Sequence, residues 1–456
     1  MSSENCNQFD IATIIIGGGL AGLTAANRLA EAERPFVLLE ATDRVGGRVR
    51  TDRDGGFQLD HGFQVLLTAY PTCRHWLDYE ALELCAFEPG ALTRSGGHFR
   101  LLSDPWRRPR RAFSTLLHPA GSIADKWRIA KLRYRACQGS LDDLYQRPDE
   151  PTIDRLLADG FTQKFIDQFF RPFLGGVFLD ESLQTSSRML EFVFRMFASG
   201  DIAVPADGMA AIPRQLAERL PRGAIRFRAT VDSIEALSDS DSESDTSAEG
   251  ASGGDWLPRY QVCLSDGTRW RCQDVIVATP GDTAARLLDQ PNLAVPWKGT
   301  TNLYYSRPET AEKNRHLMLR GDEAGPIQSA VFLSDVAPRY APSRQSLVSV
   351  SVDTAGMSEE APDELDDEAL DRLVRGQLQR WFGSAVEQWQ LLRTFHVPYG
   401  LPSGDLKTVI RDPHFREGPM GQRGGCYLAG DFFETPSIEG AMNSGQRAAE
   451  AILSGK

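Results

Sequence analysis

The first forty residues change from one hydrophobic pattern to another and back again. Residues 11–16 form a mostly β-branched run, which is typical of a parallel strand buried on both faces. Residues 20–32 then place leucine and alanine at helical spacing, until Pro35 breaks the pattern. Residues 36–39 are a second apolar run, which ends at Glu40. The pattern predicts a β-α-β unit and therefore a parallel sheet.

The remainder of the chain predicts strands and helices around that unit. Residues 238–255 interrupt them with small and polar side chains, six of them acidic, and we expect a disordered hairpin loop there. The expected helices lie at residues 151–220, 363–382 and 439–453, and the expected strands at 225–235, 256–277 and 426–429.

The composition is that of an ordinary globular protein, with 41% hydrophobic and 25% charged residues among 456. It excludes a wholly disordered chain, a collagen-like fibre and a small disulfide scaffold. Fifty Lys and Arg against 62 Asp and Glu give a net charge of −12, which argues against nucleic-acid binding. The seven cysteines show neither C-x-x-C nor zinc spacing, so we expect a reducing, cytoplasmic environment and no metal site. No apolar run is long enough for a transmembrane helix.

The turn after the first strand carries the pattern Gly17-x-Gly19-x-x-Gly22. The first glycine permits a tight turn, the second lets the backbone approach a pyrophosphate, and the third lets the helix pack closely on the strand. Leu20 and Ala21 then present helix N-terminal N–H groups to the phosphates. Because strand, helix and second strand follow in register, the sequence predicts a dinucleotide site.

Two further features decide which dinucleotide is bound. Glu40, at the end of the second strand, is placed to accept hydrogen bonds from a ribose diol and disfavours a 2′-phosphate. Gly46-Gly47-Arg48 follows, and Thr51 lies three residues beyond it. Residues 17–51 together resemble the extended FAD fingerprint of the flavin amine oxidase superfamily, which includes amine oxidases, protoporphyrinogen oxidase and the carotene desaturases.

The C-terminal residues carry the same resemblance. Gly430-Asp431, followed by residues 437–445, is similar to the closing flavin motif of the superfamily. The resemblance implies that Asp431 meets the ribityl or pyrophosphate region, while Ile438 and Ala441 begin a helix that faces the flavin pyrimidine. It further places Val231 against adenine and Gly62 among the cofactor contacts, and no cysteine is placed for a covalent link, so we expect non-covalent FAD.

Two departures weaken an amine oxidase interpretation. The position of the lysine near the flavin falls at Thr300, with Lys298 two residues away, and Ser437 replaces the second cage aromatic. Residues 59–64, which read Leu-Asp-His-Gly-Phe-Gln, together with Ala69-Tyr70-Pro71, instead resemble the plant- and cyanobacterial-type carotene desaturases. The resemblance implies hydride abstraction from a C–H bond of a hydrophobic, isoprenoid-like substrate, with a quinone or O2 as the electron acceptor.

The sequence does not identify a catalytic acid or base. The candidates for an active-site role are His61 and Tyr304. The competing interpretation is a structural hydrogen bond for His61 and a place in the core for Tyr304. Tyr305, Phe178 and Phe194 are expected either in the cavity wall or in the core. The apolar stretch 169–178 is either a channel wall or a buried helix end.

Residues 94–135 differ from the remainder in charge, with eleven Lys and Arg against two acids. Tryptophan, phenylalanine and leucine alternate with these cations, for example at Trp106, Phe113 and Trp127. Two interpretations of this stretch remain: it lies at the surface of an anionic lipid membrane, or it is a solvated basic face.

We therefore expect an α/β flavoprotein with a discontinuous, Rossmann-like FAD domain and a substrate domain of mixed sheet and helices. The alternatives are an FAD-dependent amine oxidase and a non-catalytic lipid-binding relative, and the oligomeric state stays open. The expected FAD-binding parts are residues 1–75, 206–290 and 401–456, and the expected substrate parts are 76–205 and 291–400.

Overall fold

The computed structural model describes residues 8–103, 107, 121–238, 257–352, 366–403 and 425–455. The expected disordered loop lies outside these residues apart from Ser238. Residues 104–106 and 108–120 of the basic stretch lie outside them as well.

The first sheet is the predicted nucleotide-binding sheet. Its order is β10-β2-β1-β13-β12-β11, and β19 also pairs with β13. Strands β10, β2, β1, β13 and β19 run parallel, whereas β12 pairs antiparallel with both β13 and β11. The bounds are β1 Gln8–Ile16, β2 Phe36–Leu39, β10 Ile225–Arg226, β11 Val231–Ala236, β12 Tyr260–Leu264, β13 Arg269–Val277 and β19 Cys426–Leu428.

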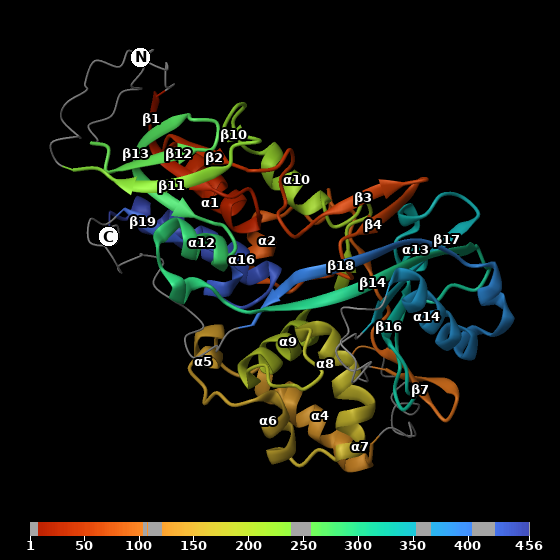
Figure 1. The fold of residues 1–456 in the computed structure, drawn as a ribbon. Helices are drawn as coiled ribbons and strands as arrows, with labels where there is room; N and C mark the ends of the chain where they lie inside the picture. Colours follow the sequence, from red (N-terminus) through yellow and green to blue (C-terminus); the bar gives the residue numbers. More distant parts are fainter. Residues whose placement is uncertain are drawn as a thin grey trace.

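Two helices from opposite ends of the chain pack beside this sheet (Figure 1). α1 (Leu20–Glu31) contacts α16 (Ile438–Leu453), and the approach is so close that a Cβ atom on Gly445 would meet the carbonyl oxygen of Ala21. The β-α-β prediction is thus confirmed, together with the C-terminal strand and helix. The other helices of this part are α2 (Pro71–Trp76), α10 (Ala211–Glu218) and α12 (Gly281–Leu288).

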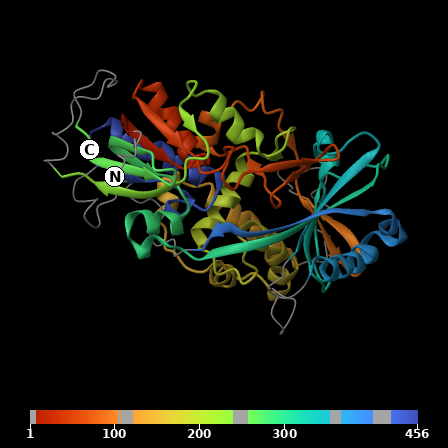
Figure 2. The same ribbon diagram turned by 45° about the horizontal axis from the view of Figure 1, so that its top comes forward.

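The second sheet has the order β18-β14-β17-β16-β15-β7-β8. Strands β14 and β18 form a long ribbon that extends from beside the first sheet into the second (Figures 1 and 2). α14 (Asp367–Phe382) packs on this sheet through Leu370, Val374 and Leu378. The strands are β7 Ala91–Ser95, β8 His98–Leu102, β14 Trp297–Pro308, β15 Leu317–Leu319, β16 Ile327–Phe332, β17 Gln345–Val352 and β18 Gln390–Pro402.

Short elements connect the two sheets. The hairpin β3 (Thr51–Asp54) and β4 (Phe57–Asp60) lies between them, and β5 (Leu66–Leu67), β9 (Ile202–Val204) and β6 (Cys85–Ala86) form a small sheet of their own. The remaining short helices are η3 Pro291–Leu293, α13 Leu333–Val336, η4 Pro338–Tyr340, η6 Gly383–Gln388 and η8 Asp431–Phe433.

A helical lobe lies below the two sheets in the view of Figure 1. Phenylalanine rings fill much of its interior; Phe161, Phe165 and Phe170, for example, contact one another. Its elements are α4 Ile123–Ala136, α5 Leu141–Tyr145, α6 Thr152–Ala158, α7 Gln163–Phe165, the π-helix η2 Ile166–Phe170, α8 Arg171–Phe178 and α9 Ser187–Ser199. The distribution of strands between the two sheets supports the expected domain boundaries, which stay a prediction.

Candidate functional site

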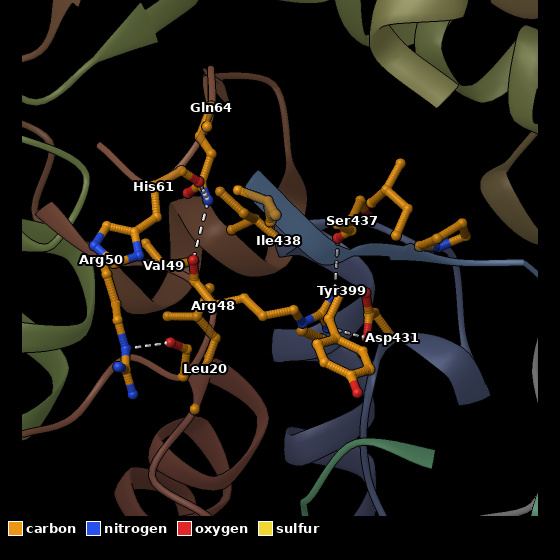
Figure 3. Close-up of a pocket in the computed structure, with 18 of the residues that line it drawn as sticks. Leu20, Arg48, Val49, Arg50, His61, Gln64, Tyr399, Asp431, Ser437 and Ile438 are labelled. Atoms are coloured by element: carbon orange, nitrogen blue, oxygen red, sulfur yellow. Dashed lines mark hydrogen bonds and ion pairs between the residues drawn. The ribbon is translucent and has the colours of Figure 1, made fainter. Parts of the chain in front are cut away.

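A cavity of about 640 Å³ lies where the first sheet, the second sheet and the helical lobe meet. Its first-sheet end is lined by residues 16–21, Glu40 and residues 46–50, and residues from both C-terminal motifs complete that end. Figure 3 shows Leu20, Arg48, Asp431 and Ile438 converging on it. Of the residues expected to bind the cofactor, all except Gly22 line this cavity.

The glycine loop is shaped for close approach of a ligand. Gly17 has a φ of +108°, and a Cβ atom there would lie 2.7 Å from the carbonyl oxygen of Ala278. Gly19 has no atom within 4 Å of its Cβ position. A Cβ atom on Gly22 would collide with the carbonyl oxygen of Gly17, so this glycine permits the close helix–strand packing. No side chain caps α1 and no acid lies in its first turn, which leaves its N-terminal N–H groups for an anionic ligand.

Glu40 is buried and holds the loop in place. Its Oε2 atom accepts a hydrogen bond from the N–H of Gly18 at 2.7 Å, and its Oε1 atom accepts from the N–H and hydroxyl of Thr42. A carboxylate oxygen has two lone pairs, so Glu40 retains acceptor capacity for a hydroxyl in the cavity.

The GGR turn packs directly against the glycine loop. Gly46 donates its N–H to the carbonyl of Gly18 at 2.8 Å. A Cβ atom on Gly47 would lie 3.3 Å from the Cα atom of Gly19. Arg48 lines the cavity, and its guanidinium pairs with Asp431 and donates to the carbonyl of Gly400 at 3.0 Å.

The closing motif forms the wall opposite the glycine loop. Asp431 is buried, and Gly430 donates its N–H to the hydroxyl of Ser444 at 3.0 Å. Ser437 caps α16 by accepting the N–H of Gly440 at 3.0 Å. The first turn of α16 therefore points its N-terminus at the cavity, as the resemblance implied for the flavin pyrimidine.

Val231 and Gly62 lie at two other points of the cavity wall. Val231 begins β11, and its carbonyl accepts from Arg286 at 3.3 Å. Gly62 has a φ of +84° and faces Thr300 and Val397 at 3.6 and 3.7 Å from its Cβ position. The glycine cradle, the uncapped helix and the ribose acceptor together fit an FAD molecule.

The far end of the cavity is apolar. α8 contributes Phe173 and Val177, whereas Leu174 and Phe178 on its other side and Phe170 at the end of η2 are buried. The stretch 169–178 is therefore both a cavity wall and a buried helix, and Phe194 does not line the cavity. The apolar side chains of this wall are Phe63, Leu67, Phe87, Phe173, Val177, Met189, Val193, Phe197, Ile202 and Leu317.

His61 lines the cavity beside the GGR turn. Its Nε2 atom lies 3.0 Å from Oδ2 of Asp52, and its ring packs on Phe395 with centroids 4.6 Å apart. Burial opposes the ionisation of Asp52, but the contact with His61 and the charge of Arg44 outweigh it and hold the pKa of Asp52 below its usual range. His61 thus has the structural hydrogen bond that the sequence offered as one of two interpretations.

Tyr304 has no place in the cavity wall. It is fully buried in β14, and its hydroxyl donates to the carbonyl of Asp60 at 3.0 Å. Tyr305 points to the other face of the sheet, where its hydroxyl donates to Asp371 at 2.7 Å. These placements favour the core interpretation of both tyrosines and argue against a catalytic Tyr304.

Asp60 is a buried hub immediately before the cavity residues His61 and Gly62. Its carboxylate accepts from the hydroxyl of Thr51 at 2.5 Å, the N–H of Met209 at 3.0 Å and the hydroxyl of Tyr340 at 2.8 Å. Burial raises the pKa of Asp60 from 3.8 to about 6, against the lowering effect of these hydrogen bonds. Asp60 thus connects the β3–β4 hairpin to the turn before α10 and to η4.

The two positions at which the resemblance departs from the amine oxidases both lie at the cavity. Thr300 and Ser437 line the cavity. Lys298 lies instead in a neighbouring cavity of about 530 Å³, where its ammonium group contacts Asp180 at 3.2 Å and Thr185 at 2.8 Å. Lys298 therefore does not replace the missing lysine from two residues away.

Sequence reasoning gave no site role to Tyr70, Arg50 or Tyr399, which all line the cavity. Arg50 donates to the carbonyl of Gly47 at 2.7 Å, and Tyr399 contacts Trp297 edge-on. Tyr70 belongs to the Ala-Tyr-Pro segment that follows residues 59–64, which was a usable signal. Tyr399 is brought in by the pairing of β18 with β14, which no local pattern indicates.

Comparisons with known proteins agree with this geometry. The family of flavin-containing amine oxidoreductases matches residues 20–453. Coproporphyrinogen III oxidase of Mycobacterium tuberculosis is 26% identical over 301 residues, which cover 60% of each chain. The chain thus matches less than two thirds of the length of that curated relative.

Solved structures share the fold at low identity. A putative protoporphyrinogen oxidase from Exiguobacterium sp. 255-15 is 18% identical, covers 100% of both chains and has a TM-score of 0.69. Wild-type putrescine oxidase bound to putrescine is 16% identical over 98% of this chain and 100% of that chain, also with a TM-score of 0.69.

The chain belongs to the flavin-containing amine oxidoreductase family. It has the α/β fold of that family, whose description is flavin-containing amine oxidoreductase. The family assignment favours an enzyme over the non-catalytic lipid-binding alternative.

Proposed function

We propose that this enzyme removes hydride from a C–H bond of a large, uncharged, hydrophobic substrate of isoprenoid type. The observation that carries the proposal is the apolar wall at the far end of the cavity, built by Phe173, Val177, Val193 and Phe197. Such a wall binds hydrocarbon by removing it from water.

The charged groups of the cavity support the same conclusion, because each already has a partner among the described residues. Arg48 pairs with Asp431, Arg286 donates to backbone carbonyls, and Glu40 accepts from Gly18. Glu88 also has a partner. An ammonium group or a set of carboxylates would therefore compete with existing hydrogen bonds for these described side chains, and burial of a charge without a partner is costly.

The chain's own residues bind and orient the reactants. When bound, FAD supplies the hydride acceptor. The apolar wall holds the substrate and excludes water, and hydride transfer depends on that alignment more than on a strong acid or base. The N-terminus of α16, capped by Ser437, places a positive dipole end at the cavity and stabilises negative charge there.

Anaerobic mixing of the purified holoenzyme with candidate substrates tests the proposal. An acyclic polyene isoprenoid in detergent micelles should bleach the flavin, and the substitution Phe197→Glu should abolish this bleaching while the flavin stays bound. Leu373→Glu, on an exposed face of α14, is the matched control and should bleach as the native chain does. If isoprenoids leave the flavin oxidised, the proposal is overturned.

A porphyrinogen is the second candidate, favoured by the match to coproporphyrinogen III oxidase. Its size suits the cavity, but its carboxylate arms need cations, and the described lining cations are Arg48, Arg50 and Arg286. Each of them is already hydrogen bonded. Flavin reduction by a porphyrinogen but not by an isoprenoid would favour this candidate.

An amine is the remaining candidate, since the family and the fold include amine oxidases. Thr300 and Ser437 weigh against it at the two positions where a lysine and an aromatic are expected. If the enzyme releases peroxide on exposure to amines, the amine is supported. If it releases no peroxide and its turnover depends on a quinone, the isoprenoid is supported.

Three further proposals accompany the substrate. FAD is held without a covalent bond, since none of the six described cysteines lines the cavity. The acceptor is a quinone or O2. The enzyme contacts membranes peripherally; among the described helices, none is long and apolar enough to cross a bilayer.

A further inference from the structure

α4 carries an apolar stripe on the face that points away from the protein. Ile123, Trp127 and Tyr134 are 62%, 75% and 68% exposed. They are spaced at i, i+4 and i+11, so they lie on one side of the helix. The opposite side, with Asp125, Leu132 and Ala136, is buried. The outward face of a helix in a globular protein is ordinarily polar, so this stripe indicates a contact surface.

Cations flank the stripe on both sides. Helical geometry places Lys131 on one flank and Lys126 on the other. Lys131 is exposed. The single acid of the helix, Asp125, is buried on the inner side and is bonded to Thr162 and Ser122. Arg128 and Arg135 also turn inward to Asp125, Asp159 and Glu191. The outer face of α4 is therefore apolar and basic within a chain of net charge −12.

We infer that this face of α4 lies on the surface of an anionic lipid bilayer. Tryptophan and tyrosine prefer the interface between headgroups and acyl chains, and flanking lysines bind anionic headgroups. A second copy of the chain fits less well, because pairing the stripe with itself brings the flanking lysines of both copies together.

The position of α4 connects this surface to the cavity. α4 packs on α9, with Arg135 paired to Glu191 and Arg133 donating to the carbonyl of Ala198. The other side of α9 carries Val193 and Phe197 into the cavity wall. Two helix layers, α4 and α9, thus separate the bilayer from the cavity, and neighbouring helices lie roughly 8–10 Å apart. This inference deepens the proposed function, since a lipophilic substrate would be drawn from the bilayer.

Flotation of the full holoenzyme with lipid vesicles tests the surface. The enzyme should bind vesicles of phosphatidylcholine with phosphatidylglycerol and should bind pure phosphatidylcholine weakly. The triple substitution Ile123→Ser, Trp127→Ser and Tyr134→Ser should weaken binding by at least about tenfold. Leu373→Ser removes an exposed apolar side chain from α14 and should leave binding unchanged.

Trp127 gives a second readout that does not depend on a loss of binding. Phosphatidylglycerol vesicles with brominated acyl chains should quench part of the tryptophan fluorescence, because Trp127 would reach the acyl region. Trp127→Phe should keep most of the binding and lose that quenching. The conservative substitution also separates contact from misfolding.

Equal flotation of the native chain and the triple variant would overturn the inference, as would quenching that persists in Trp127→Phe. A native dimer that the triple variant converts to a monomer would also overturn it, in favour of a second copy. The assays contain no substrate, so failure here and failure of the substrate proposal are distinguishable.

Discussion

Arg48 and Asp431 form an ion pair at the cavity, although 383 residues separate them in the chain. The guanidinium of Arg48 also lies over the ring of Trp297 at 5.1 Å and donates to Gly400. The GGR turn, the closing motif and the β14–β18 ribbon are thus tied together at one point (Figure 3). The pair holds the two ends of the chain around the cofactor site.

Removal of Arg48 should destabilise the fold and the cofactor site together. Asp431 is 4% exposed, so Arg48→Ala leaves a buried carboxylate unpaired and should lower the free energy of unfolding by about 2 kcal/mol. Flavin occupancy should fall with it. Arg44→Ala breaks an exposed pair with Asp52 and should change the free energy of unfolding by less than about 0.5 kcal/mol. Similar losses in both variants, by denaturant titration, would contradict this role.

Gly22 and Gly376 should respond in opposite ways to alanine. A Cβ atom on Gly22 meets the carbonyl of Gly17, so Gly22→Ala should separate α1 from β1 and reduce flavin binding and stability. Gly376 lies within α14 with nothing within 4 Å, so Gly376→Ala should stabilise the chain by about 0.5–1 kcal/mol. Thermal unfolding and flavin retention on filtration measure both effects. Equal behaviour of the two variants would refute the packing argument.

Glu40 should be needed both for the glycine loop and for FAD. Glu40→Ala leaves the N–H of Gly18 without its acceptor, which costs about 1–3 kcal/mol. Glu40→Gln keeps one acceptor oxygen, so it should retain more of the stability while still weakening FAD binding. Titration of the apoprotein with FAD separates the two variants. Full flavin occupancy in Glu40→Ala would undermine the ribose assignment.

Asp60 should make stability depend on pH. Its pKa is raised from 3.8 to about 6 by burial, so the folded chain binds this proton more tightly than the unfolded chain does. The resulting stabilisation is complete below the unfolded pKa and is lost as the pH rises through about 6. Relative to Asp60→Asn, the native chain should therefore lose about 3 kcal/mol between acid and neutral pH. A stability difference that stays constant across that range would contradict the buried hub.

Local patterns predicted the nucleotide-binding part of the fold well. The strands at residues 11–16 and 36–39 and the helix from residue 20 follow from periodicity and glycine spacing, both of which act within a few residues. The expected cofactor residues gather at one cavity for the same reason, because strand ends and helix starts are locally encoded.

Contacts between distant segments could not be predicted in this way. The GGR motif marks Arg48, but its partner Asp431 lies at the other end of the chain, and no local pattern pairs the two. Tyr304 was a candidate for the site, but the pairing of β14 with β17 and β18 buries it. The stripe on α4 has helical spacing that any core helix would share, so only its exposure in the structure distinguishes it.

The most direct test of the account is the visible spectrum of the holoenzyme during anaerobic mixing with an acyclic polyene isoprenoid, a porphyrinogen and an amine in turn. The account predicts that the holoenzyme contains a bound flavin, which denaturation releases from the chain. The isoprenoid should bleach this flavin, and the amine should leave it oxidised. A protein that takes up no FAD, or a flavin that only the amine reduces, would contradict it.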